Sequence, residues 1–401
     1  MGTKYRVLSL DGGGSWALIQ AKALINMFGE GTSGWDVLRA FDLVAANPGG
    51  SIVLGCLIED LTLGQIFDFF MDETKRRSVF SKTSSHLYRV LEKLAGMGPK
   101  YSTEKKLPAL QSVLPARGNM VLGDAVRGIP GQRGTGENLR VLIVGFDYDR
   151  CRATFFRSAA TKGPAYGTGA AAGVTLAEAI HASTNAPVNY FDGPATYPED
   201  PGRYWDGAIT GCNNPVLAGV AEAVTTTRDF LEIVALSLGT ATVALPWPEP
   251  GEEDSPYVRQ PSDVGLKNDL VKLAGSILDD PPDMASFLAH VMTGSGSGLP
   301  AGSAADSQIV RMNPMISPVQ DANKQWTAPG GLTLAQFQAL AALGMDAIDQ
   351  ADVESIANYA ELWLKDQAPN QPVRMDGDTL AREIGQSTFS AAKAAWKAIE
   401  G

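Results

Sequence analysis

Two turns in the sequence have the residue types and the spacing of ligand-binding turns. In the first, Asp11-Gly12-Gly13-Gly14 follows the apolar run Val7-Leu8-Ser9-Leu10 and leads into a helical stretch from Ala17. Glycine allows a ligand to approach the backbone closely, and the N-terminus of a helix favours negative charge. The N–H groups of this loop are therefore suited to an oxyanion, although a phosphate loop or an ordinary strand-to-helix turn has the same pattern.

The second turn joins a short apolar strand to an apolar helix. The run from Phe41 to Ala46 reads as a buried strand that breaks at Asn47-Pro48-Gly49-Gly50, and a helix follows from Ile52 to Ile58. This order of elements is the context of a nucleophile elbow, in which a G-x-S-x-G motif exposes a serine hydroxyl.

Together the two turns resemble the patatin-like phospholipase family, whose members carry a D-G-G-G loop and then an F-D-L-x-x-G-T-S-T-G-G elbow. Further segments match the family in the same order: two central strands (137–144 and 153–158), an A-S-x-A-A-P-like segment (182–187), D-G-A and N-N-P (206–208 and 213–215), S-L-G-T (237–240) and R-M-N-P (311–314). One glycine-rich loop is a weak signal, but this ordered set is specific. The resemblance implies an α/β fold with a mixed, mainly parallel sheet and helices on both faces.

The resemblance also implies a mechanism, because the family hydrolyses acyl esters of lipids with a Ser-Asp dyad and without histidine. Asp206 would be the base of the dyad, and the N–H groups of the Gly12–Gly14 loop would form the oxyanion hole. Outside this motif, Asp206 would be interpreted as a cap of a helix or turn. The spacing from Phe41 to Ile52 equals that of the family, so Pro48 stands at the position of the nucleophile and cannot act as one.

Proline at this position predicts a relaxed turn. It has no hydroxyl and no N–H, and its φ near −65° excludes the strained positive φ of an elbow serine. Ala46 replaces the first glycine of the elbow, and Trp16 stands where the family usually has Arg or Lys. We expect the indole to narrow the mouth of the cleft.

Ser51 is the alternative nucleophile, three residues after Pro48 in the first turn of the helix. A serine there usually bonds to the local backbone, and it lies about one helical turn from the tip of the elbow. Two hypotheses follow. In the first, the chain keeps a cleft for an acyl-ester or lipid ligand without the dyad activity. In the second, it is an acyl hydrolase with a displaced nucleophile such as Ser51. Both hypotheses are compatible with peripheral contact of the protein with a membrane, and neither hypothesis requires a cofactor or a metal.

Composition fits an enzyme-sized globular protein. The 401 residues are 44% hydrophobic and 19% charged, and the net charge of −11 gives no long-range attraction to nucleic acid. Three widely separated cysteines and a start without a leader-like segment predict a reduced, cytoplasmic protein. We expect a patatin-like domain over residues 1–320 and a C-terminal helical appendage over 330–401 that is scaffold rather than site.

The elements that must position these turns follow from periodicity. Strands are predicted at 5–10, 41–45, 139–146, 153–157 and 230–237. Two separate amphipathic helices, 266–278 and 284–292, precede a Gly/Ser tract at 294–303 that is predicted to be flexible. The tail is predicted as three helices, with Thr333 before 334–342, Asp352 before 353–366 and Asp378 before the last.

Overall fold

An eight-stranded mixed sheet forms the centre of the fold. The computed structural model describes residues 4–81, 100–131, 139–159, 173–188, 190–198, 200–226, 232–261, 264–294, 307–374 and 384–400. Within these residues the strand order is β5-β6-β3-β2-β1-β7-β9, with β4 also paired to β3. The strands are β1 (Lys4–Leu10), β2 (Leu43–Ala46), β3 (Arg140–Asp147), β4 (Arg152–Arg157), β5 (Ala195–Tyr197), β6 (Asp200–Asp206), β7 (Glu232–Leu238) and β9 (Ile309–Met312). Neighbours from β3 to β9 pair in parallel, whereas β4 and β6 pair with β3 antiparallel.

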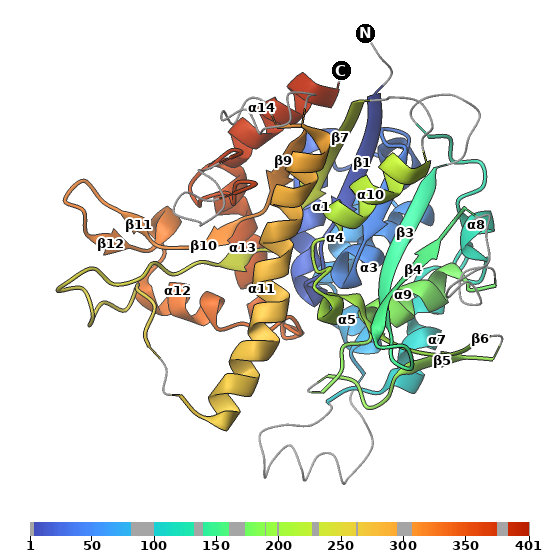
Figure 1. The fold of residues 1–401 in the computed structure, drawn as a ribbon, viewed down its shortest axis with the longest axis horizontal. Helices are drawn as coiled ribbons and strands as arrows, with labels where there is room; N and C mark the ends of the chain where they lie inside the picture. The colour runs from blue at the N-terminus through green and yellow to red at the C-terminus, as the bar shows by residue number, and fades with distance from the viewer. Residues whose placement is uncertain are drawn as a thin grey trace.

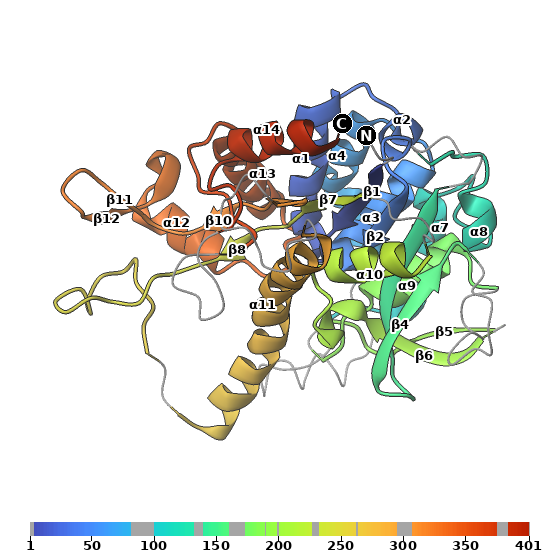
Figure 2. The ribbon, with the colours of Figure 1, turned by 45° about the horizontal axis from the view of Figure 1, so that its top comes forward.

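Helices cover both faces of this sheet (Figures 1 and 2). One face packs on α1 (Leu18–Phe28), α3 (Pro48–Ile58), α4 (Leu63–Met71) and α9 (Leu176–Thr184), and the other on α10 (Val216–Thr226) and α11 (Leu266–Thr293). Adjacent residues of β1 alternate between the two cores, as side chains of a strand must, so Val7 belongs to one core and Leu8 to the other. Burial on both faces explains why the central strands read as continuous apolar runs.

The remaining elements surround this core. They are α2 (Gly34–Leu38), α5 (Glu73–Val79), α7 (Thr103–Val113), α8 (Leu122–Ala125), α12 (Leu334–Ala341), α13 (Gln350–Leu364), α14 (Phe389–Glu400), the short pairs β8 (Thr242–Val243) with β10 (Met315–Ile316) and β11 (Val319–Gln320) with β12 (Trp326–Thr327), and the 3-10 turns η1 (Gly14–Ala17), η2 (Gly207–Thr210) and η4 (Pro329–Gly331). The C-terminal helices join the main core, where Trp396 of α14 stacks on Phe41 at a centroid distance of 5.9 Å. Among the described helices, none is long and apolar enough to cross a membrane.

The mixed, mainly parallel sheet with helices on both faces confirms the predicted fold class, and the five predicted strands are β1, β2, β3, β4 and β7. The prediction of two helices over 266–292 was wrong, because α11 continues through Pro281 and Pro282. The φ of proline is compatible with a helix, so the helix continues there although it loses two N–H donors. The Asn214 side chain also donates to the Pro282 carbonyl at 3.1 Å.

The C-terminal helices correspond in part to the prediction. Thr333 caps α12 in a capping box with Gln336, as its position indicated. The next helix begins at Gln350, and its N-cap, Asp349, lies three residues before the predicted cap, Asp352. The last begins at Phe389, and Asp378 lies outside the described residues, as does the Gly/Ser tract beyond Gly294.

Candidate functional site

A cavity of about 350 Å³ lies at the carboxyl ends of the parallel strands, the edge where open α/β sheets bind ligands. Segments that follow β1, β2, β6 and β7 meet there with β9, α11 and a C-terminal loop. The lining consists of Asp11, Gly12, Gly13, Trp16, Pro48, Asp206, Ala208, Asn213, Thr240, Ala241, Thr242, Val243, Leu278, Pro282, Asp283, Arg311, Ile316, Leu343 and Met345. The structure therefore brings the glycine loop, Pro48 and Asp206 to one site.

Pro48 is the first residue of α3 and forms part of the cavity wall. Asn47 before it is extended, with φ −135°, and no residue from Ala46 to Gly50 has a positive φ. This relaxed geometry is the one predicted for proline, which is well tolerated at the first helical position. The ring packs against the glycine loop: its Cδ would lie 2.9 Å from a Cβ placed on Gly12.

Ser51 faces away from the cavity. Its side chain is fully buried in α3, and its hydroxyl donates to the Pro48 carbonyl at 2.6 Å. The expectation that this serine bonds to local backbone is confirmed, and Ser51 does not belong to the cavity lining.

The glycine loop keeps a conformation that only glycine adopts readily. Gly13 has φ 150° and Gly14 φ 58°, and a Cβ on either would overlap Thr240 or the Met345 carbonyl. The Gly12 N–H already donates to the Asn213 carbonyl at 2.9 Å. Among the described residues, no acceptor takes the N–H groups of Gly13 and Gly14. Gly13 lines the cavity, so its N–H remains for a ligand there, whereas Gly14 lines a smaller neighbouring pocket.

Asp206 ends β6 and caps η2. Its carboxylate is buried and accepts the Ala208 N–H at 2.7 Å. Burial raises its pKa to about 7, against the lowering effects of that N–H and of Lys106. Asp206, Pro48 and Met345 also line a second, mainly apolar pocket of about 20 Å³.

Lys106 is a buried lysine in the lining of this second pocket, and no sequence pattern predicted it. It lies on α7, donates to the Thr184 carbonyl, and places Nζ 3.8 Å from the centroid of the Phe191 ring. Burial lowers its pKa well below the usual range, and the carboxylate of Asp206 opposes this. A lysine within a helical run ordinarily points to solvent. Lys106 is buried instead because segments far along the chain pack around it.

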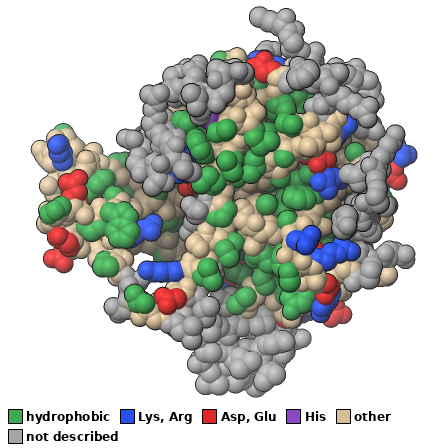
Figure 3. Space-filling view, viewed as in Figure 1, with side chains coloured by type: hydrophobic (Ala, Val, Ile, Leu, Met, Phe, Trp, Pro, Cys, Tyr) green, Lys and Arg blue, Asp and Glu red, His purple; other side chains and the backbone are tan. Residues whose placement is uncertain are grey.

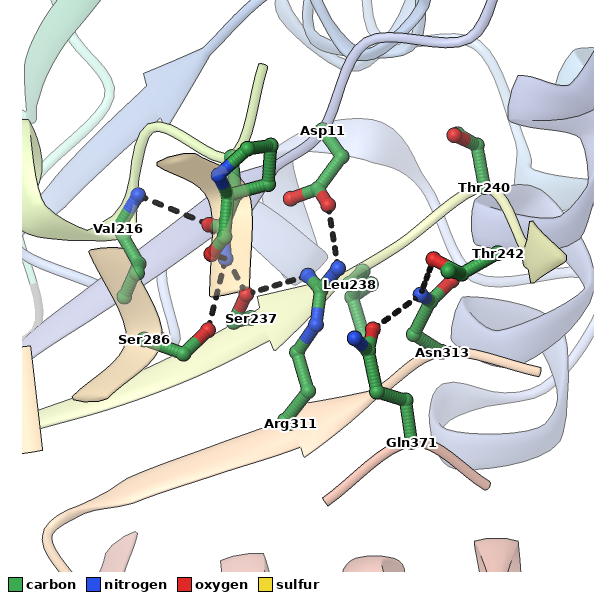
Figure 4. Close-up of polar contacts among 12 residues, drawn as sticks. Asp11, Val216, Ser237, Leu238, Thr240, Thr242, Ser286, Arg311, Asn313 and Gln371 are labelled. Atoms are coloured by element: carbon green, nitrogen blue, oxygen red, sulfur yellow. Dashed lines mark hydrogen bonds and ion pairs between the residues drawn. The ribbon is translucent and has the colours of Figure 1, made fainter. Parts of the chain in front are cut away.

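A buried ion pair fixes the start of the glycine loop (Figure 4). The Arg311 guanidinium donates to Asp11 Oδ2 at 2.6 Å and to Ser237 Oγ at 2.8 Å. Burial raises the pKa of Asp11 to about 6, although Arg311 lowers it. The Gln20 side chain also donates to the backbone carbonyls of Asp11 and Leu238 at the ends of β1 and β7. Together with Arg311 of β9, it links these three strands.

A family model described as Patatin-like phospholipase matches residues 8–220, more than half of the chain. The chain belongs to the patatin-like phospholipase family.

Solved structures similar to this patatin-like protein are distant in sequence. VipD from Legionella pneumophila is 11% identical with a TM-score of 0.33, and the match covers 90% of this chain and 67% of that chain. The type III effector protein ExoU is 12% identical with a TM-score of 0.25, and the match covers 90% and 54%. Likenesses this distant carry no argument about activity. No curated protein matches the sequence.

The C-terminal region of this patatin-like protein contributes to the cavity, although it was expected to be scaffold. Leu343 and Met345 line the site. The Met345 carbonyl accepts the Ser15 N–H at 3.0 Å, and the Gly344 carbonyl accepts the indole N–H of Trp16 at 3.0 Å. Trp16 lies in the cavity wall as predicted, held there by a loop that no local pattern marked as functional.

The two described histidines do not line the cavity of this patatin-like protein. His181 and His290 are buried away from its lining, and His86 lies outside the described residues. Burial lowers the pKa of His181 to about 3. In the part of the chain that the structure describes, no group of three or more His, Cys, Asp or Glu side chains could hold a metal ion.

Proposed function

We propose that this patatin-like protein binds an acyl-ester or lipid ligand in the cavity and lacks hydrolysis by a Ser-Asp dyad. The observation that carries the proposal is Pro48, whose ring forms the wall next to the glycine loop where the family carries its serine. Proline has neither a hydroxyl to attack a carbonyl nor an N–H to stabilise the oxyanion that such an attack forms.

No other side chain of the lining replaces that nucleophile. Among the described residues, neither serine nor cysteine lines the cavity. The Thr240 hydroxyl donates its proton to the Gly12 carbonyl, and the Thr242 hydroxyl accepts from Asn313 at 2.9 Å. The burial of Ser51 and its bond to Pro48 argue against the alternative of an active hydrolase that uses this residue.

The groups that remain are suited to binding. The N–H group of Gly13, at the start of a helical turn, is suited to an ester or phosphate oxygen in the cavity. Several apolar side chains of the lining suit an aliphatic chain, namely Trp16, Leu278, Ile316, Leu343 and Met345. Without a nucleophile, oxyanion donors and a base leave only the modest rate enhancement that the rest of such a site provides.

The fluorophosphonate reaction tests the proposal directly, since this probe labels activated serines. We expect no labelling of the wild-type chain and negligible hydrolysis of p-nitrophenyl esters. Pro48→Ser alone should restore little, because Ala46 and Trp16 still depart from the family's site, and adding Ala46→Gly should increase labelling. Strong labelling of the wild type, lost in Ser51→Ala, would replace the proposal with the displaced-nucleophile hypothesis.

Contact with a lipid surface is part of the proposal, and α11 offers a face for it. Its exposed apolar side chains include Leu273, Leu288, Val291 and Met292, and hydrophobic side chains gather on the face that contains α11 in Figure 3. The other side of the same helix lines the cavity. Replacing Leu288 and Val291 by serine should reduce sedimentation of the protein with phosphatidylcholine vesicles, and unchanged sedimentation would remove α11 from the contact.

A further inference from the structure

Lys106 is the only lysine among the buried residues that the structure describes, with 1% of its surface exposed. Its Nζ donates to the carbonyl of Thr184, the last residue of α9, and lies against the face of the Phe191 ring. It forms no ion pair with a described carboxylate. The amine therefore sits among one carbonyl, one aromatic ring and apolar side chains, and no acid holds it in its charged form.

This environment favours the neutral amine. Removal from water disfavours an ammonium group more than an amine, so burial lowers the pKa of Lys106 well below its usual range, and the charge of Asp206 only opposes this shift. The neutral amine still satisfies the Thr184 carbonyl, because one of its two N–H groups is sufficient for that bond. It also keeps a lone pair, which makes a desolvated lysine a nucleophile.

The small pocket gives an electrophile access to this side chain. Lys106 lines it, the rest of the wall is mainly apolar, and the volume of about 20 Å³ holds one group of the size of a water molecule. A carbonyl end group is of this size. Pro48, Asp206 and Met345 line both this pocket and the large cavity. An alkyl chain whose carbonyl end lies beside Lys106 therefore has the large cavity next to it.

We propose that Lys106 captures an aliphatic aldehyde as an imine, with the carbonyl end in the small pocket and the alkyl chain in the large cavity. This inference goes beyond the proposed lipid binding, because it assigns a reaction to a residue outside the large cavity. It does not require an ester as the ligand.

The reaction balances without an oxidant or a reductant. Nζ adds to the carbonyl carbon, and one proton moves from the nitrogen to the oxygen to give a carbinolamine. The hydroxyl then leaves with the second nitrogen proton as water, and a C=N bond replaces the C=O bond. Asp206 lines the same pocket, so its carboxyl group is placed to relay both protons from nitrogen to oxygen.

Reduction with cyanoborohydride tests the proposal, since it converts an imine into a stable secondary amine. The full chain is incubated at pH 7 with octanal and cyanoborohydride, and peptide mass spectrometry locates the alkylated lysines. Lys105, the exposed neighbour on α7, is the control within the same sample. We expect Lys106 to be alkylated at least about tenfold faster than Lys105, because an ordinary lysine is almost entirely protonated at pH 7.

Two variants and a second aldehyde sharpen the test. Lys106→Met keeps an apolar side chain of similar length and should lose the adduct, whereas Lys105→Met should keep it. Propanal should require at least about a tenfold higher concentration than octanal for half-modification, because five fewer methylene groups leave water. If Lys106→Met does not fold, the comparison of the two lysines in the wild type still decides.

Alkylation of Lys106 no faster than that of Lys105 overturns the proposal, and so does an adduct that persists unchanged in folded Lys106→Met. Equal half-modification by propanal and octanal overturns the placement of the chain in the large cavity. Binding of an intact lipid is measured separately, without aldehyde or reductant. The failure of the imine therefore leaves the proposed binding function standing.

Discussion

The glycine loop and the elbow turn face the same cavity and differ in backbone conformation. Gly13 and Gly14 have positive φ values, and no described residue accepts from their N–H groups. The turn at Pro48 has become an ordinary helix start without a strained residue. The glycine loop has anchors outside the elbow, because Arg311 donates to the Asp11 carboxylate and Gln20 to the Asp11 carbonyl, which also accepts the Gly50 N–H at 3.0 Å. The loop can therefore hold its conformation beside a turn that has no strained residue.

The largest expected effect comes from the network that holds the glycine loop. Arg311→Gln would leave the Asp11 carboxylate buried without its cation, and we expect the free energy of unfolding to fall by about 3–5 kcal/mol. Urea denaturation measures this loss. Arg39→Gln, in an exposed ion pair with Asp36, is the control and should cost at most about 1 kcal/mol. Equal losses in the two variants would show that the network does not anchor the loop.

The loop itself should be the next most sensitive. In Gly14→Ala the new Cβ meets the Met345 carbonyl at a φ of 58°, so strain and overlap together should cost about 3 kcal/mol. Gly31→Ala places its Cβ in open space and should change stability by less than about 0.5 kcal/mol. A tolerated Gly14→Ala, measured by urea denaturation, would mean that the glycine loop is as relaxed as the elbow.

Asp206 should make the fold less stable as the pH rises, whereas an acid in a salt bridge makes a fold more stable as the pH rises. Burial raises its pKa from 3.8 to about 7, so between these values the native state binds a proton that the unfolded state does not. Stability therefore falls as pH rises from about 4 to about 7, and the penalty is complete above that window. Asp206→Asn should flatten this dependence between pH 5 and pH 8, whereas Asp269→Asn should not. The same pH dependence in all three proteins would place the raised pKa elsewhere.

We expect the smallest change in stability from a substitution in the helix that follows the elbow turn. Ser51→Ala removes one buried hydrogen bond to the Pro48 carbonyl and should cost about 1 kcal/mol. Because the hydroxyl lies outside the cavity, ligand affinity by calorimetry should equal that of the wild type. A change in affinity larger than the change in stability would bring Ser51 into the site.

The sequence predicted the elements that local patterns determine, and it failed for elements that depend on packing with distant segments. β1, β2, β3 and β7 are apolar runs buried on both faces, and they were predicted. β6 was missed because Pro201 and Gly202 within it resemble a turn, and β9 because it has only four residues. The α11 helix was divided at Pro281-Pro282 by a local rule that its packing overrides.

The residues of the site also fall into those that the sequence predicted and those that it did not. Motifs placed the glycine loop, Pro48 and Asp206, which line one cavity in the structure. Lys106, Asp283 and Met345 were missed, because each is brought to the site by contacts far along the chain and none stands in a recognisable motif. The domain division at 1–320 and 330–401 stays a prediction, as does the cytoplasmic location.

Native mass spectrometry of the wild-type chain incubated with lysophosphatidylethanolamine tests the central claim most directly, because it reports binding and cleavage together. The account predicts a complex whose added mass is that of the intact lipid, unchanged after prolonged incubation. A complex with the free fatty acid, or an acylated chain, would show that the site cleaves esters despite Pro48.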